Sequence, residues 1–461
     1  MSDVIVIGGG FAGLAAAVAL AAEGVRVTVL EKRPVLGGRA YSYTDAGTGE
    51  TIDNGQHAMM GCYHEMFRFL GRIGALDKLT IQRSLRVVML DPEQGAGTIA
   101  CPPLPSPLHM AAGVLGYRLL GVADRVRVLL GGLRLLAMKR RRDARLAALT
   151  VEGVLDLLGQ SAATRRAFWH PVAIATLNED PALACADLLA EVMVRAFFAG
   201  KDDARFVLAK VGLSDLYTGD ARRFVEERGG RVETKAQVVG IGFRAGEVSH
   251  LDLRDGQRLT AAAYISAVPP QGLFPLLPLA LRRDVPALGA IERLTSSPIV
   301  SVHVWFDQPL IAHDFAGFVG TRTHWLFNRD KITGRDPRGG SYLTFVTSGA
   351  RALVDLDNEA FVAATLADVR RVLPAAARAR VRHTQVVKEK FATMSPTVEA
   401  ASLRPPATTP ITNLVLAGDW TATGLPATIE SAVASGHRAA ALVAACLTAR
   451  GLGREEARAA S

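Results

Sequence analysis

A glycine-rich turn near the start of the chain constrains the fold more than any other feature. Val4–Ile7 is a β-branched run, typical of a buried parallel strand. Gly8, Gly10 and Gly13 follow it as G-x-G-x-x-G, and an alanine-rich helix is expected over 14–22. In this pattern the glycines permit the turn, the approach of a pyrophosphate and the close packing of helix on strand. The sequence therefore predicts a dinucleotide-binding βαβ unit.

A second strand is expected over Val25–Leu30, and Glu31 stands at its end. A carboxylate at this position can accept hydrogen bonds from the ribose of an adenosine. The apolar run Val4–Ala22 also has the composition of a signal peptide or a membrane span. No basic residue precedes it and successive glycines interrupt it after four strand residues, so we favour the dinucleotide unit.

Two polar loops follow this unit. In Gly37-Gly38-Arg39 the glycines allow close approach of a ligand to the backbone, and the guanidinium can neutralise a pyrophosphate. The segment from Asp53 to His57 is a second glycine-bearing loop. It would lie beside the ring of a flavin, or it would be a surface turn.

The end of the chain carries the second strong motif. A strand is expected over 413–417, followed by Gly418-Asp419-Trp420, a Gly-Leu-Pro-Ala loop and an alanine-rich helix over 433–447. Asp419 would accept from a ribityl hydroxyl. The start of the helix near Thr428 would face the pyrimidine edge of a flavin and stabilise negative charge there.

Composition bounds the remaining possibilities. A chain of 461 residues is too long for one core and suggests two domains. The net charge of +9 and the 49% hydrophobic content suit an anionic membrane surface, nucleic acid or a solvated arginine-rich surface. The sequence has no nucleic-acid module and no metal-ligand spacing, so contact with a membrane is favoured over binding of nucleic acid. A solvated arginine-rich surface stays an open alternative. The four cysteines are scattered, which indicates free thiols in a reducing cytoplasm.

The middle of the chain is expected to be helical, and a proline- and glycine-rich stretch at 91–107 is expected to mark a boundary. A basic amphipathic helix is predicted at 114–142, with Gly131-Gly132 weakening or breaking it. It would lie in a membrane interface or pack into the second domain. Arg127 and Arg134 lie opposite its apolar face, which consists of Val126, Leu129, Leu130, Leu133 and Leu136.

Other expected elements are a helix at 62–80, a strand meander from 238 to 268 and a strand at 300–306 carrying His303. Pro171 is expected to end a helix at 168–171. Trp169, His170 and Asn178 would line a pocket, or they would be ordinary core residues.

These segments together resemble the superfamily of FAD-dependent amine oxidases and carotenoid desaturases. The resemblance rests on G-G-G-F-A-G-L at 8–14, E-K-R at 31–33, G-G-R-A at 37–40, the strand at Val238, and G-D-W with T-G-L-P-A-T-I-E-S-A at 418–432. The segments 53–63, 169–178 and 427–436 are most similar to the squalene-associated group, the hydroxysqualene dehydroxylases of bacterial hopanoid biosynthesis.

The resemblance implies an α/β fold, with a Rossmann-like FAD-binding domain of parallel sheet plus β-meander and an α+β substrate domain inserted in two segments. Residues 1–85, 205–272 and 405–461 are assigned to the first domain, and 86–204 and 273–404 to the second. FAD would be bound non-covalently, with no metal, by Gly8, Gly10, Phe11, Ala12, Gly13, Glu31, Lys32, Arg33, Gly38, Arg39, Gly55, Gln56, His57, Val238, Ala267, Gly418, Asp419, Thr428 and Ile429.

The implied reaction converts hydroxysqualene to squalene: reduced flavin gives a hydride to an allylic carbon as the hydroxyl leaves as water. The long isoprenoid needs an apolar tunnel, and the leaving hydroxyl needs an acid or a hydrogen-bond donor. His57, His170 and His303 are candidates for the acid, and the rings of Trp169 or Trp420 for stabilising a carbocation-like state. We expect a cytoplasmic protein, peripheral on the membrane, and leave self-association open.

Three alternatives remain. A carotenoid or isoprenoid desaturase would move the hydride from substrate to oxidised FAD with the same motifs. An amine oxidase would need aromatic walls around the flavin, and the chain has only seven tyrosines. A binding protein without catalysis would be expected to lose the flavin contacts, which are present here.

Overall fold

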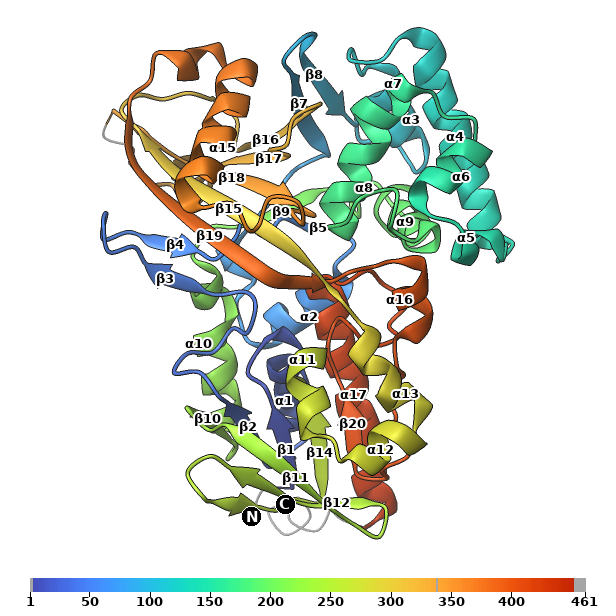
Figure 1. Ribbon diagram of the computed structural model, residues 1–461, viewed down its shortest axis with the longest axis vertical. Helices are drawn as coiled ribbons and strands as arrows, with labels where there is room; N and C mark the ends of the chain where they lie inside the picture. The colour runs from blue at the N-terminus through green and yellow to red at the C-terminus, as the bar shows by residue number, and fades with distance from the viewer. Residues whose placement is uncertain (1–2, 337–338, 452–461) are drawn as a thin grey trace.

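A five-stranded parallel sheet forms one half of the protein (Figure 1). The computed structural model describes residues 3–336 and 339–451. The strand order is β10 (Arg231–Thr234), β2 (Val27–Glu31), β1 (Val4–Ile7), β14 (Ala263–Ser266) and β20 (Leu414–Leu416), and all neighbours run parallel. Because the sheet is covered on both faces, every residue of β1 and β2 is buried. The carboxyl ends of all five strands meet at one edge.

Helices α1 (Phe11–Ala22) and α17 (Ile429–Ala449) pack along each other on one face of this sheet. Gly436 permits the contact, because a β-carbon there would lie 2.2 Å from the carbonyl oxygen of Ala12. Among the described residues, α17 is the one helix whose length and mean hydropathy would suffice to cross a membrane. Its packing against α1 gives it a place in the core. Helices α2 (His64–Arg72) and α10 (Leu213–Glu226) complete this layer.

The other face of the parallel sheet is covered by an antiparallel meander, as the sequence predicts. It consists of β11 (Val238–Arg244), β12 (Glu247–Leu253) and β13 (Arg258–Leu259). Ile5, Ile7 and Leu30 pack against it in a second core. Short helices complete this side: α11 (Pro270–Leu273), α12 (Leu279–Asp284), α13 (Pro286–Gly289) and α16 (Val398–Leu403).

A seven-stranded mixed sheet lies beyond the carboxyl edge (Figure 1). Its order is β19 (Val381–Met394), β15 (Ser296–Phe306), β18 (Ser341–Ser348), β17 (Trp325–Asn328), β16 (Phe315–Phe318), β7 (Arg86–Asp91) and β8 (Gly95–Ala100). Helix α15 (Asn358–Val372) packs on its outer face. The strands of the parallel sheet all lie within the ranges predicted for the FAD-binding domain, and those of the mixed sheet within the ranges predicted for the substrate domain. The exact domain boundaries stay predictions.

Helices from 108 to 198 form a layer beside the mixed sheet (Figure 1). They are α3 (Leu108–Leu115), α4 (Val122–Arg140), α5 (Arg145–Ala148), α6 (Val151–Leu157), α7 (Ala162–Thr164), α8 (His170–Leu177) and α9 (Ala186–Val192), with π-helical turns at Arg165–Trp169 and Met193–Phe198. Smaller sheets pair β3 (Ser42–Thr44) with β4 (Thr51–Asp53), and β9 (Phe206–Ala209) with β5 (Met59–Met60) and β6 (Leu79–Ile81).

Several local predictions are wrong. The stretch 91–107 is not a continuous loop, because 95–100 is strand β8, paired with β7. The predicted helix 114–142 is two helices, since α3 ends at Leu115 and α4 begins at Val122. The helix predicted at 62–80 ends at Arg72, and Gly74, with φ of +73°, leads into β6.

Two predicted helix breaks are also wrong. Gly131-Gly132 does not interrupt α4, because both glycines are buried and a β-carbon on Gly131 would lie 2.5 Å from the amide nitrogen of Gln160. Pro171 does not end a helix. It lies directly after the π-helical turn Arg165–Trp169, and the chain stays helical through it to Leu177.

Candidate active site

The first part of the candidate site is the turn between β1 and α1. Gly8 has φ of +110°, a conformation that favours glycine, and its N–H donates to the carbonyl of Leu30 at 2.8 Å. Helix α1 begins after Gly10, and no side chain caps it. Its first N–H groups and its dipole therefore point toward the carboxyl edge of the sheet, where an anion can bind.

Glu31 and Arg33 hold this turn in place. One carboxylate oxygen of Glu31 accepts from the N–H of Gly9 and the other from the N–H of Arg33, both at 2.9 Å. The Arg33 guanidinium donates to the carbonyl of Gly38 at 2.6 Å, which brings the second glycine loop against the first. Glu31 keeps further lone pairs, so its predicted bond to a ribose stays a prediction. Lys32 is exposed beside them.

Phe11 and Ala12 were predicted to contact the cofactor, but their side chains are buried in the core. The ring of Phe11 stacks on Tyr217 with centroids 3.8 Å apart, and Ala12 packs against α17. Only their backbone lies at the turn. Ala267 follows β14 and donates to the carbonyl of Ile7 at 2.8 Å, which places it beside the same turn, and Val238 is buried at the start of β11.

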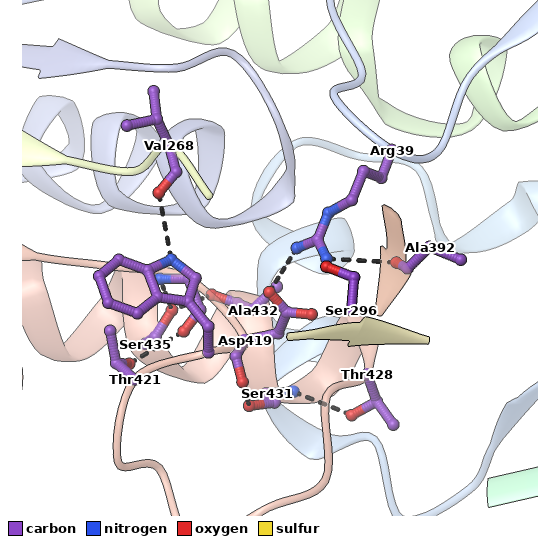
Figure 2. Close-up of polar contacts among 12 residues, drawn as sticks. Arg39, Val268, Ser296, Ala392, Asp419, Thr421, Thr428, Ser431, Ala432 and Ser435 are labelled. Atoms are coloured by element: carbon purple, nitrogen blue, oxygen red, sulfur yellow. Dashed lines mark hydrogen bonds and ion pairs between the residues drawn. The ribbon is translucent and has the colours of Figure 1, made fainter. Parts of the chain in front are cut away.

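Arg39 and Asp419 form an ion pair where the two large sheets meet (Figure 2). Arg39 also donates to the carbonyl of Ala392, near the end of β19, at 3.2 Å. Asp419 is buried, and the Arg39 side chain is one-third exposed. The sequence predicted a pyrophosphate contact for Arg39 and a ribityl contact for Asp419. The structure brings both side chains to one place.

Helix α17 supplies a second helix N-terminus. Thr428 caps it by accepting from the N–H of Ser431 at 3.2 Å, and Gly418 donates its N–H to the hydroxyl of Ser435 at 2.7 Å (Figure 2). Ile429 is the first residue of the helix. Trp420 is fully buried and donates to the carbonyl of Val268 at 3.1 Å, so we do not propose that its ring stabilises a cation.

The 53–57 loop is clamped by a residue that the sequence analysis did not single out. Arg329, at the start of α14 (Arg329–Thr333), donates to the Gln56 side chain at 2.5 Å and pairs with Asp53 at 3.1 Å. Both members of the ion pair are almost fully buried. The other carboxylate oxygen of Asp53 accepts from the N–H of Leu213 at 2.9 Å. A lone arginine 276 positions away carries no local signal of this contact.

His57 follows the clamped residues and is half-buried. Burial lowers its pKa; the carboxylate of Asp53 opposes that shift and the guanidinium of Arg39 adds to it. The imidazole is therefore neutral near pH 7, with one ring N–H to donate. Gly55 lies against β15, since a β-carbon there would be 3.4 Å from the hydroxyl of Ser301.

His303 lies on the face of β15 that is turned toward this loop. Its Nδ1 is 2.8 Å from the hydroxyl of Tyr342 and 3.1 Å from that of Thr344. Burial, together with the nearby charge of Arg329, lowers the pKa of His303 to about 3. The imidazolium form is scarcely populated near neutral pH, so His303 is a poor source of the proton and we do not propose it as the acid.

We expect the stability of the protein to fall in acid because of His303. The unfolded chain binds a proton on this residue below about pH 6.5, whereas the folded protein binds it only near pH 3. The unfolded state thus binds more protons between these values, and the contribution to stability is complete above pH 6.5 and lost toward pH 3. Urea unfolding should show a loss of about 2–3 kcal/mol between pH 7 and 4.5 from this group alone.

His303→Gln should flatten this dependence, and His313→Gln is the matched control because His313 is exposed. Some acid sensitivity should remain in His303→Gln, since burial also lowers the pKa of His324, to about 4. Equal pH slopes for the wild type and His303→Gln would contradict the prediction.

Trp169, His170 and Asn178 are engaged in structural contacts. Trp169 is fully buried and donates to the Gln160 side chain at 2.7 Å. His170 pairs with Glu152 at 2.6 Å, and Asn178 donates to Thr393 at 2.8 Å. These contacts account for all three residues, and we do not propose Trp169 or His170 for catalysis.

A cleft with an empty volume of about 440 Å³ opens beside the N-terminus of α17. Its titratable groups include Glu430, which is buried, and Cys62, which is partly buried. Burial raises the pKa of both, that of Cys62 to about 12, and Glu430 accepts from two backbone N–H groups of α2. The cleft is lined by Met60, Cys62, Tyr63, Thr176, Glu191, Val192, Arg195, Ala196, Leu425, Pro426, Thr428 and Glu430. The lining from 191 to 196 has no sequence motif, so only the fold identifies it.

The residues at the carboxyl edge fit FAD. A glycine turn without β-carbons, an uncapped helix N-terminus and a guanidinium together suit a pyrophosphate. A second, capped helix N-terminus at Thr428 adjoins the apolar cleft, where a flavin ring would meet a substrate.

The chain is similar to known flavin proteins over nearly all of its length. The sequence pattern of the family described as flavin containing amine oxidoreductase matches residues 11–444. A hydroxysqualene dehydroxylase of Sinorhizobium fredii is 30% identical, with 95% of this chain and 98% of that protein covered. The 15-cis-phytoene desaturase of Narcissus pseudonarcissus is 25% identical, with 94% and 78% covered. An oxidoreductase from Methanosarcina mazei has a TM-score of 0.75 and 19% identity, with 94% and 98% covered, which shows the fold alone.

Proposed function

Because the chain belongs to the family of flavin containing amine oxidoreductases, we propose that it converts hydroxysqualene to squalene. It is an FAD-dependent oxidoreductase related to hydroxysqualene dehydroxylases. The observation that carries the proposal is full-length similarity at 30% identity to a dehydroxylase, against 25% to a desaturase.

The cleft supports an isoprenoid substrate. Met60, Val192, Leu425 and Pro426 give it apolar walls, which suit a hydrocarbon that offers few hydrogen bonds. Thr428 forms part of the same wall at the end of α17. A hydrocarbon in this cleft would lie against the position predicted for the flavin.

When bound, fully reduced FAD (FADH2) would supply the hydride and also, on reoxidation, the one proton with which the hydroxyl departs as water. Among the three candidate histidines we retain His57. It is half-buried, in a loop fixed through Asp53 and Gln56 by Arg329, and its neutral ring can donate a hydrogen bond to the oxygen. Loss of one such donor is expected to slow turnover by about 10²-fold.

The test is anaerobic mixing of the photoreduced protein with hydroxysqualene in detergent. We expect the absorbance of oxidised flavin to return and squalene to appear in the lipid extract. His57→Phe should retain FAD and slow this reoxidation, while His313→Phe, at an exposed position, should not. An unchanged rate in His57→Phe would remove His57 from the mechanism.

A desaturase is the second candidate, because the phytoene desaturase is related over the whole chain. Its signature would be bleaching of the oxidised protein by a polyene precursor, with no reoxidation of the reduced protein by hydroxysqualene. That pair of results would overturn the dehydroxylase proposal.

A further inference from the structure

Large apolar side chains that face solvent are concentrated in one segment. Sixteen large hydrophobic residues are exposed among those described, and seven of them lie within thirty consecutive positions. Scattered exposed leucines need no explanation, but such a concentration marks an interaction surface. The seven are Leu104, Leu108, Leu115, Val122, Val126, Leu130 and Leu133.

Helix α4 is apolar on two faces. Its inward face, Val128, Gly131, Gly132, Leu135 and Leu136, is buried. Val122, Val126, Leu130 and Leu133 lie at helical spacing on another face and are 44–72% exposed. The stripe predicted as the apolar face of this helix is therefore mostly the outward one, with Leu136 as its buried member. Ordinary packing into the domain does not account for the exposed face.

Helix α3 extends this surface. It packs beside α4 at one end of the protein (Figure 1). Leu108 and Leu115 are seven positions apart, so they project from one side of α3, and both are about half exposed. Leu104 precedes the helix in an exposed proline-rich turn. We call the seven residues the α3–α4 face.

The charge around this face is strongly positive. Residues 104–142 contain eight basic residues and one acid, Asp124, which pairs with Arg127. Lys139 is paired with Asp187. The other exposed arginines of the segment form no ion pair with a described acidic side chain: Arg118, Arg134, Arg140, Arg141 and Arg142.

We propose that the α3–α4 face docks on the surface of an anionic lipid bilayer. Its leucine and valine side chains enter the boundary between headgroups and acyl chains, and the unpaired arginines contact the lipid phosphates. An anionic bilayer offers acyl chains to the leucine and valine side chains and phosphates to the unpaired arginines, so it matches both features of this face. The proposal is independent of the reaction that the protein catalyses.

Docking in this way would place the cleft close to the lipid. Helix α4 packs against α9 and the following π-helical turn, and Glu191, Val192, Arg195 and Ala196 of those segments line the cleft. Gly132 is buried at this contact, where a β-carbon would lie at an ordinary distance of 3.4 Å from the ring of Phe198. One layer of helix thus separates the docked face from the cleft.

The test is co-sedimentation of the FAD-loaded protein with vesicles of phosphatidylcholine containing 30% phosphatidylglycerol. We expect the wild type to bind, and Val126→Ser/Leu133→Ser to bind at least about tenfold more weakly. Leu279→Ser is the matched control, because Leu279 is 78% exposed on α12, at the other end of the protein (Figure 1). Flavin absorbance verifies that each variant is folded.

Salt and lipid composition test the role of charge. Arg140→Gln/Arg141→Gln/Arg142→Gln should weaken binding, and 0.5 M salt should do the same for the wild type. Equal binding to pure phosphatidylcholine would overturn the anionic part of the proposal. No wild-type binding, or equal binding by the double serine variant, would overturn it entirely. The proposal would also be overturned if the wild type is a dimer, the double serine variant is a monomer, and the two bind vesicles equally well.

Discussion

Gly13→Ala is expected to destroy FAD retention and to destabilise the protein. A β-carbon at this position would lie 1.9 Å from the carbonyl oxygen of Gly8, so either α1 or the turn must move. Overpacking of a rigid backbone contact lowers the free energy of unfolding by about 3 kcal/mol or more. If the turn moves and FAD binding loses the same free energy, FAD binds about a hundredfold more weakly. Thermal unfolding and titration of the apoprotein with FAD measure the two effects.

Gly10→Ala is the informative partner variant. The nearest atom to its β-carbon would be the Cα of Gly38 at 3.6 Å, an ordinary contact, so the apoprotein should fold almost as the wild type does. The methyl group would nevertheless project where a pyrophosphate must approach the turn. We expect weak FAD binding with little loss of apoprotein stability. Normal FAD binding by Gly10→Ala would contradict the placement of the pyrophosphate over this turn.

Arg329→Met is expected to reduce the free energy of unfolding by about 3–5 kcal/mol, because it leaves the buried carboxylate of Asp53 without its counter-ion. The variant also frees Gln56, so the 53–57 loop should loosen. Urea unfolding of apoprotein and FAD-loaded protein measures the loss in each state. A greater loss in the FAD-loaded protein would show that the clamp positions the loop for the cofactor.

Two variants separate the buried ion pair from a general effect of removing arginine. Asp53→Asn/Arg329→Met removes both charges and should recover part of the stability lost in Arg329→Met. Arg293→Met breaks the pair with Glu399, whose members are both about 60% exposed, and should cost less than about 1 kcal/mol. A change in Arg329→Met as small as that in Arg293→Met would contradict the assigned clamp.

The glycine turn and the strands beside it were predictable because their parts are neighbours in the sequence. Gly8, Gly10 and Gly13 act on a turn of six residues, and Glu31 ends the adjacent strand. The strands β1, β2, β14 and β20 were identifiable for the same reason, since burial in a parallel sheet leaves an apolar run that needs no distant partner to be recognised. The resemblance of these segments to a flavin family is confirmed over residues 11–444.

The prediction from sequence failed for α4, because two faces of this helix are apolar. In α4 both the buried and the exposed face are apolar, so periodicity alone cannot tell which one packs inward. Gly131 decides the matter, because its missing β-carbon lets the helix approach the side chain of Gln160 closely. A glycine pair that looks like a helix breaker in the sequence is a packing surface in the fold.

By itself the sequence determined the strands, glycine turns and helix starts at the carboxyl edge, because local propensity and backbone geometry set them. The tertiary structure alone decided which distant charges meet, pairing Arg39 with Asp419 and Arg329 with Asp53 across hundreds of positions. It also placed Trp169 and His170 in structural contacts. It brought Val192 and Ala196, which no motif marks, to the cleft beside the motif residue Thr428. The physical reason is that side-chain contacts between distant segments depend on how whole layers pack, and that packing leaves no periodic signal in either segment.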